Sequence, residues 1–326
     1  AIEDLSAAYI SVGSTQTEGL NFVRHYLMKD GTTFTCPPID DPNIDHALGE
    51  LDQRVHVLRF DQEDGQSIVL VNYGLHADTI NGELISGDWP TLLRHRLEKA
   101  LDNVKTIFFN GAQGDVNHVN VNAKDGDMND MFHDFDDVAR GYGHARHMGN
   151  VVAGAVLQVY DKVNYVEVNS LKCVQKTIQL PSNMADPSEL AEAHRIKELY
   201  DAGRQNELPY EGMELTTVVA DACRKVALEN GPESFPLRLS AIVLGDFALL
   251  GIPGEPFNAV GRAIKEAEGF KMVSPCCLTN GCRGYFPTKD AYDEGGYEAR
   301  ASRFKAGTAE LIAKEAKALL EEMHSI

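Results

Sequence analysis

Several features that would assign the chain to a particular class of protein are missing from its sequence. No apolar run approaches the roughly 18 residues of a membrane span, and the start, Ala-Ile-Glu-Asp-Leu, has neither the basic nor the apolar part of a signal peptide. Lysine and arginine together number 30 against 49 aspartates and glutamates, which gives a net charge of −19. Phosphate binding needs a basic surface, so the charge argues against a nucleic acid as the main partner. The cellular compartment stays open.

Cysteine is scarce, and several catalytic motifs are absent. The six cysteines include no Cys-x-x-Cys pair, which argues against a disulfide framework or a zinc ribbon. There is no Gly-x-Ser-x-Gly elbow for a serine nucleophile. A phosphate-binding Gly-x-Gly-x-x-Gly or Gly-Lys-Ser/Thr loop is also missing. Serine-triad hydrolases and nucleotide-binding enzymes are therefore disfavoured.

The residues that are present predict a globular protein in which strands and helices alternate. Hydrophobic residues make up 43% of the chain and charged residues 24%, which is ordinary for a folded domain. Residue patterns predict strands at 55–60, 67–72, 105–110, 166–180, 235–244, 247–252 and 271–278. They predict helices at 88–101, 143–160, 187–203, 215–229 and 257–266, and from 302 onwards. We expect an α/β fold of mixed α+β layers, with helices packed on a mixed sheet, as one domain over residues 1–326.

Polar clusters directly follow several of the predicted apolar strands. If these strands are parallel neighbours, their carboxyl ends lie at one edge of a sheet, where ligands usually bind in layered α/β folds. The sequence therefore predicts one site that brings together the following side chains: His76, Asp115, Asn117, His118, Glu255 and Tyr285.

The residue types alone leave two interpretations open at most of these positions. His76 follows a buried strand and suits either a metal ligand or general base, or a hydrogen-bonded core histidine. Glu255 suits either a metal-binding carboxylate or a carboxylate at a helix entry. Tyr285 taken alone is more typical of a packed aromatic residue. Two further histidines, His144 and His147, are expected on a solvated helix face.

The densest polar stretch is residues 110–118, Asn-Gly-Ala-Gln-Gly-Asp-Val-Asn-His. Its Asn-Gly and Gly-Asp pairs are typical of a tight turn. Alternatively, Gly111 and Gly114 let backbone N–H groups approach a substrate oxygen, which is the geometry of an oxyanion site.

Four ordered motifs resemble one known family. These are a strand followed by His-x-x-Thr at His76, Asn-Gly-x-x-Gly-Asp-Val at 110–116, Pro-Gly-Glu-Pro-Phe at 253–257 and Asn-Gly-x-x-Gly-Tyr-x-Pro-Thr at 280–288. Together they resemble the neutral/alkaline (non-lysosomal) ceramidases, in particular their shorter bacterial relatives. Further likenesses are residues 24–31, residues 85–90, and Tyr292 with Tyr297-Glu298. The resemblance extends over nearly the whole chain.

The resemblance implies a zinc-dependent amidase with one Zn²⁺ per chain and a small-molecule or lipid amide as substrate. By motif position, His76, Glu255 and Tyr285 correspond to three of the family's metal ligands. Arg24 falls in a shared stretch, and we assign it to substrate binding together with Gly111 and Gly114. A metal-bound hydroxide would attack the carbonyl carbon.

The sequence departs from the family pattern in three ways. The family's upstream His-Thr-His-Ser-Gly-Pro stretch is missing, so the chain resembles the C-terminal two-thirds of a catalytic domain, and an N-terminal fragment of the same protein is an expected partner. Asn117 replaces the family's catalytic serine and is expected to stabilise an oxyanion, with His118 or Asp115 transferring protons. The C-terminal immunoglobulin-like domain is missing, so ceramide itself is not the expected substrate. The alternatives are a ceramidase-like binding protein without turnover and a metal-dependent esterase or phosphodiesterase.

Overall fold

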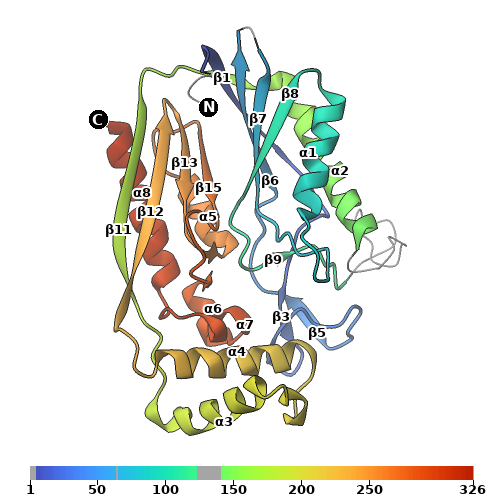
Figure 1. Ribbon diagram of the computed structural model, residues 1–326, viewed down its shortest axis with the longest axis vertical. Helices are drawn as coiled ribbons and strands as arrows, with labels where there is room; N and C mark the ends of the chain where they lie inside the picture. The colour runs from blue at the N-terminus through green and yellow to red at the C-terminus, as the bar shows by residue number, and fades with distance from the viewer. Residues whose placement is uncertain (1–4, 64, 123–140, 326) are drawn as a thin grey trace.

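Four layers make up the folded chain, with two β-sheets in the middle and helices on both outer faces (Figure 1). The computed structural model describes residues 5–63, 65–122 and 141–325. The sequence also predicts a polar loop, rich in Asp, Asn and Gly, from residue 111 to about 137, and this loop is described only as far as residue 122. No helix in these ranges is both long and apolar enough to cross a membrane.

The first sheet has five strands in the order β10-β1-β6-β7-β8, and only β7 and β8 run parallel. The strands are β1 (Ala8–Gln16), β6 (Arg54–Gln62), β7 (Ser67–Tyr73), β8 (Val104–Asn110) and β10 (Asn164–Val166). Helices α1 (Asp88–Ala100) and α2 (Tyr142–Val159) cover the outer face. Alternate strand residues such as Val57 and Val71 are fully buried under Trp89 and Leu93 of α1.

The second sheet has four strands in the order β11-β12-β13-β15, and only β13 and β15 run parallel. The strands are β11 (Leu171–Pro181), β12 (Ser234–Leu244), β13 (Phe247–Gly251) and β15 (Met272–Cys276). Helices α5 (Asn258–Lys265) and α8 (Thr308–Ser325) pack on its outer face. Fully buried Leu239 and Leu250 of the sheet meet Ile264 of α5 and Ile312 of α8 there.

The inner faces of the two sheets pack against each other through a small apolar core that includes Leu58, Leu70 and Phe247. A polar contact also crosses this interface. Asn72 on β7 donates through Nδ2 to the carbonyl of Phe109 and to that of Pro275 on β15, both at 2.9 Å. The two sheets are thus held together close to the carboxyl ends of their parallel strands.

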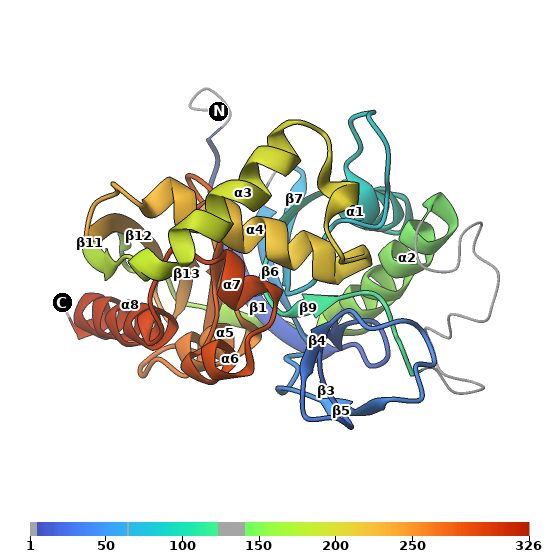
Figure 2. The same ribbon diagram turned by 90° about the horizontal axis from the view of Figure 1, so that it is seen from below.

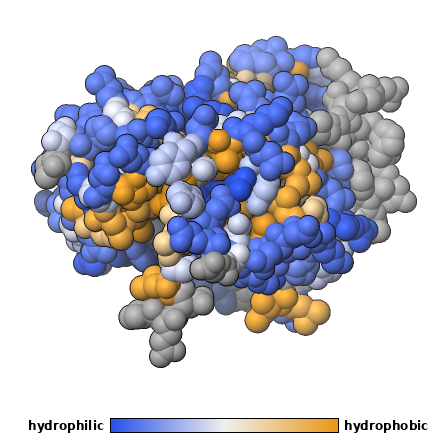
Figure 3. All heavy atoms as spheres, turned by 90° about the horizontal axis from the view of Figure 1, so that it is seen from above, coloured by the Kyte–Doolittle hydropathy of each residue, from blue (hydrophilic) through white to orange (hydrophobic). Residues whose placement is uncertain are grey.

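Small elements cover that end of the sandwich (Figures 1 and 2). A three-stranded sheet is formed by β3 (His25–Met28), β4 (Thr33–Thr35) and β5 (Ile44–Ala47). Beside it lie α3 (Leu190–Asp201), α4 (Gly212–Leu228), α6 (Lys289–Glu294) and α7 (Tyr297–Ala301). Two short strand pairs, β2 (Phe22–Val23) with β9 (Val116–Asn117) and β14 (Glu255–Pro256) with β16 (Tyr285–Phe286), complete the fold. The opposite end, seen from above in Figure 3, is mostly hydrophilic with separate apolar groups.

The mixed α/β layers and most of the predicted elements are confirmed, and three predictions need correction. The strand predicted over 166–180 is two strands in different sheets, because β10 ends at Val166 and β11 begins at Leu171. The segment between these two strands was included in one predicted strand because apolar residues continue to alternate there: Val168 packs between the two sheets. The last helix begins at Thr308 instead of residue 302. His144 is fully buried instead of solvated.

A buried group of charges joins the three-stranded sheet to helix α7. Glu298 of α7 is fully buried and binds Arg24 Nη2 at 2.5 Å and His25 Nε2. Burial alone would raise the pKa of the Glu298 carboxyl, but the positive charges of Arg24 and then His25 outweigh it and lower this pKa to about 2. For His25 the effect of burial has the opposite sign and lowers the pKa. The negative charge of Glu298 outweighs burial, and the pKa of His25 is raised.

Replacing Glu298 with glutamine should lower the free energy of unfolding by about 3–5 kcal/mol at pH 7, because buried Arg24 loses its counter-charge. The depressed pKa means that the stabilisation by Glu298 is fully present above about pH 4.5 and is lost as the pH falls toward 2. In a His25→Gln background, where residue 25 cannot titrate, urea denaturation with and without Glu298→Gln should therefore show a smaller difference at about pH 3.5 than at pH 7. Exposed Glu322→Gln is the control. An equal difference at both pH values would contradict this account.

Candidate functional site

Loops that follow the parallel strands converge at one end of the sandwich. β7 leads to His76, and β8 leads to the polar segment that begins at Asn110. The carbonyl of Asn110 accepts from the N–H of Cys277, just after β15, at 2.8 Å, so the ends of β8 and β15 are joined across the two sheets. β14 and β16 place Glu255 directly beside Tyr285 in parallel register. Segments far apart in the sequence thus supply one site.

His76 and Glu255 form the centre of this site. His76 Nε2 lies 3.0 Å from Glu255 Oε2, and His76 Nδ1 lies 2.7 Å from the carbonyl oxygen of Val116. A carbonyl oxygen only accepts hydrogen bonds, so Nδ1 carries a proton and donates it to Val116. Both side chains are mostly buried, with 11% of His76 and 14% of Glu255 exposed.

This arrangement provides a test of whether the residues fit a metal ion. With Nδ1 protonated, Nε2 and the carboxylate oxygen can face each other favourably only if a proton or a cation lies between them. An imidazole whose other nitrogen donates to a backbone carbonyl is the usual form of a metal-binding histidine. Gln113 supports Glu255 in turn by donating through Nε2 to Oε2 at 3.3 Å. Nitrogen, carboxylate and phenol donors together suit zinc.

The same residues supply few donors. Within the described ranges, no group of three or more His, Cys, Asp or Glu side chains is arranged to hold a metal ion. His76 and Glu255 are two side chains of these types, and the third predicted ligand is Tyr285. A closed zinc site commonly has four ligands, so these residues fit a metal that keeps open positions or takes a further donor.

Tyr285 lies beside this centre and contacts several aromatic and charged groups. Its ring centroid is 6.3 Å from that of His76 and 5.9 Å from that of Tyr297, which meets it edge-on. The Arg24 guanidinium carbon lies 5.4 Å from the ring centroid. Burial raises the pKa of the Tyr285 hydroxyl, while the charge of Arg24 opposes this rise.

Arg24 has protein partners on two sides in this structure. Besides its ion pair with Glu298, Nη2 donates to the carbonyl oxygen of Gly114 at 2.7 Å. The residue is only 9% exposed. Its visible role is thus to hold Glu298, Tyr285 and the 110–118 segment together, and its assignment to substrate binding stays a prediction.

The two glycines of the polar segment have N–H groups that are already bonded. The N–H of Gly111 donates to Tyr73 and that of Gly114 donates to Pro256, each at 2.9 Å. Neither is available to a substrate oxygen in this arrangement. What the structure shows at Gly114 is close packing, because an added Cβ would lie 2.5 Å from the backbone oxygen of Glu255.

The three predicted catalytic residues contact different partners. Asp115 Oδ1 accepts from the N–H of Asn258 at the start of α5 at 2.6 Å, and burial raises the pKa of this carboxyl. Asn117 donates through Nδ2 to Cys36 Sγ at 3.2 Å. His118 is buried, with its Nδ1 3.5 Å from Asp78 and its ring 5.1 Å from that of His144. All three residues lie within two positions of Val116, and it is the Val116 carbonyl that accepts the hydrogen bond from His76.

Sequence analysis missed the site's supporting residues His25 and Gln113 and left Glu298 without a role. Glu298 lies in a stretch already recognised as family-like, and His25 directly follows Arg24. Both could have been suspected from these neighbours. Gln113 lies within the polar segment but has no residue pattern that would have distinguished it.

Comparison with solved structures shows the fold. No protein-family model and no curated protein matches this chain. One similar solved structure is the neutral ceramidase from Pseudomonas aeruginosa, with a TM-score of 0.66 and 15% identity over 100% of this chain and 54% of that one. Another is a ceramidase complexed with C2, with a TM-score of 0.64 and 18% identity over 99% of this chain and 55% of that one. The chain thus spans about half the length of these proteins and has a ceramidase-like fold.

Proposed function

We propose that this protein is a metal-dependent hydrolase of a C–N amide bond in an N-acyl substrate. The observation that carries the proposal is the contact of His76 Nε2 with Glu255 Oε2 at 3.0 Å while Nδ1 is fixed on Val116. That geometry requires a proton or a cation between the two side chains, and a metal ion meets this requirement. In the reaction, water adds its oxygen to the acyl carbon, the C–N bond breaks, and the products are a carboxylate and a protonated amine.

The metal proposed for this site is zinc, held by His76, Glu255 and Tyr285. When bound there, it would lower the pKa of water from about 15.7 to about 7 and so supply the nucleophile. The Val116 carbonyl keeps the His76 ring oriented, and Gln113 fixes the Glu255 carboxylate. Arg24, facing the Tyr285 ring, favours the ionised form of that phenol, which is its ligand form.

Asn117 is proposed as the donor to the developing oxyanion. Its amide now donates to the thiol of Cys36, and sulfur is a weak acceptor that a substrate oxygen can replace at small cost. Asp115 or His118 is proposed to transfer the proton to the leaving amine. For Asp115, burial raises the pKa of the carboxyl and so favours the protonated form that a general acid requires.

The class of reaction is supported by the two structural neighbours, both of which are ceramidases. Ceramide is itself an N-acyl amide. At 15% and 18% identity the likeness shows the fold, and a fold hosts many activities. We therefore propose only the hydrolysis of an amide bond by analogy with these neighbours, and not their substrate.

A second candidate is a ceramidase-like binding protein without turnover. It is favoured by the small number of His, Cys, Asp and Glu donors within the described residues and by the asparagine at position 117. Metal content separates the two candidates, because a binding protein of this kind has no need for near-stoichiometric zinc.

Protein purified without added metal or chelator should contain about one zinc ion per chain, and His76→Ala should lose it, because the variant removes the nitrogen donor. Elemental analysis measures the metal, and intact mass on the same sample shows whether another polypeptide accompanies the chain. His95→Ala, at an exposed histidine of α1, should retain the zinc. Absence of metal from the wild-type protein, before and after incubation with zinc, would favour the binding protein.

Asn117→Ala should lower kcat on an amide substrate by two to three orders of magnitude, because one lost oxyanion donor raises the barrier by about 2.7–4 kcal/mol. Cys36→Ala serves as the matched control, since it removes the present partner of the amide but leaves the donor in place. Steady-state kinetics with both variants distinguishes catalysis from packing. A loss below about threefold in Asn117→Ala would remove this residue from the mechanism.

A further inference from the structure

An apolar cavity of about 540 Å³ lies at the side of the sandwich where β8 is the last strand of the first sheet and β11 is the last strand of the second. Its lining includes Phe109 of β8, Ile242 of β12 and Leu249 of β13. Phe109 and Ile242 each remain 40% exposed, and Leu249 also packs on the core between the two sheets. The cavity is thus an uncovered continuation of that apolar core, with a volume in the range of small-molecule sites.

A second cavity, of about 520 Å³, adjoins the first, because Gln175 and Asn280 line both. Arg238 and Arg283 line the second cavity, and no carboxylate lines either one. Neither arginine forms an ion pair in the described part of the chain. In a protein with a net charge of −19, these two residues make the second cavity a local site of positive charge.

The pairing of β11 with β12 places the apolar part and the basic part in line on one face of the second sheet. Alternate residues of a strand share a face, and on this face the successive cross-strand pairs are Ile242 with Cys173, Ser240 with Gln175 and Arg238 with Thr177. At about 3.4 Å per residue, the distance along β12 from Ile242 to Arg238 is about 14 Å. A groove that is apolar at one end and basic at the other fits a single-chain amphiphile with an anionic head.

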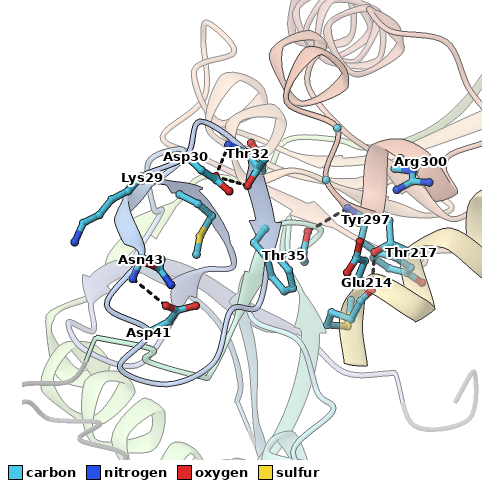
Figure 4. Close-up of a pocket in the computed structure, with 16 residues that line it drawn as sticks. Lys29, Asp30, Thr32, Thr35, Asp41, Asn43, Glu214, Thr217, Tyr297 and Arg300 are labelled. Atoms are coloured by element: carbon cyan, nitrogen blue, oxygen red, sulfur yellow. Dashed lines mark hydrogen bonds between the residues drawn. The ribbon is translucent and has the colours of Figure 1, made fainter. Parts of the chain in front are cut away.

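A larger cavity, between the three-stranded sheet and helices α4 and α7, has charges of both signs in its lining (Figure 4). Its volume is about 660 Å³, and Glu214, Lys29 and Arg300 line it together with the apolar Met213. Such a mixture selects no single class of ligand by charge. The groove along β11 and β12 does, because its charged side chains are arginines alone.

We propose that the two adjoining cavities form one binding groove for a fatty carboxylate, with its alkyl chain against Phe109, Ile242 and Leu249 and its carboxylate at Arg238 and Arg283. Burying alkyl carbon against apolar side chains is favourable, and a guanidinium binds a carboxylate through paired N–H groups. The groove is separate from the proposed catalytic centre, since none of the proposed metal ligands lines it. Binding there does not depend on the proposed amide hydrolysis.

The test compares decanoate with decyltrimethylammonium, which has the same alkyl chain and a cationic head, by isothermal titration calorimetry. Decanoate should bind at least about tenfold more tightly, since about 1.4 kcal/mol of charge pairing accounts for that factor. Acetate should not bind measurably, because it has the same head without the alkyl chain. Equal affinities for the two amphiphiles, or tighter binding of the cation, would overturn the proposal.

Two sets of variants locate the ligand. Ile242→Trp, which fills the apolar part of the groove, should weaken decanoate binding at least about tenfold, and Leu157→Trp, at a residue 39% exposed on α2, is the matched control. Arg238→Gln combined with Arg283→Gln should remove the preference for decanoate over the cation, whereas Arg94→Gln, on α1, should leave it unchanged. Thermal unfolding shows that each variant is folded. Unchanged decanoate affinity in both sets would overturn the proposal.

A carboxylate is also a product of the proposed amide hydrolysis, so binding in the groove has to be distinguished from binding at the catalytic centre. Decanoate binding that His76→Ala retains and Ile242→Trp weakens would support the groove. Binding that His76→Ala removes and Ile242→Trp retains would overturn it and indicate a product site at the centre. A polypeptide that covers this face would prevent decanoate binding and accompany the chain in intact-mass measurements, which would also overturn the proposal.

Discussion

The buried carboxylate of Glu298 is the constraint on which the rest of the site depends. A charge removed from water is tolerated only when it is paired and hydrogen-bonded, and Glu298 meets this condition through Arg24 and His25, which precede it by more than 270 residues. The same Arg24 reaches the Gly114 carbonyl and faces the Tyr285 ring. Because separating any of these segments would leave an unpaired charge inside the protein, the three-stranded sheet, helix α7 and the polar segment have to assemble together.

Close contacts between backbone segments position the loops that carry His76 and Glu255. Gly74 follows β7, and an added Cβ there would collide with the backbone oxygen of Ala112; one on Gly114 would collide with that of Glu255. Glycine at these two places lets the loops after β7, β8 and β13 approach to backbone distance, and it is this approach that brings His76 to Glu255. A pair of side chains positioned by the main chain in this way is rigid, because moving it requires shifting buried strands.

Local signals in the sequence predicted those parts of the fold that local physics determines. The β12–β13 hairpin follows from Gly245-Asp246 between apolar runs, and α1 follows from its spacing of Trp89, Leu93 and Leu97. Strand β1 was missed because its burial depends on β6 and β10 on either side, a pairing between distant segments that no local pattern reports. The burial of His144 and the role of His25 were missed for the same reason. His76, Glu255 and Tyr285 could be predicted to lie near one another because each belongs to a recognisable motif that follows a strand. Their mutual contacts are known only from the structure.

The two central sheets and the elements that cover their end determine different properties of the candidate site. The four-layer arrangement fixes where the polar residues of the candidate site gather, because the ends of the parallel strands meet there. Elements β4, α4 and α7 only cover this end of the sandwich, and their side chains are free to differ between proteins of the same fold. In this chain they include threonines and carboxylates, the apolar Met28, Phe34 and Met213, and the cations Lys29 and Arg300. The fold therefore sets where His76 and Glu255 meet, whereas the residues that cover this end are particular to this chain.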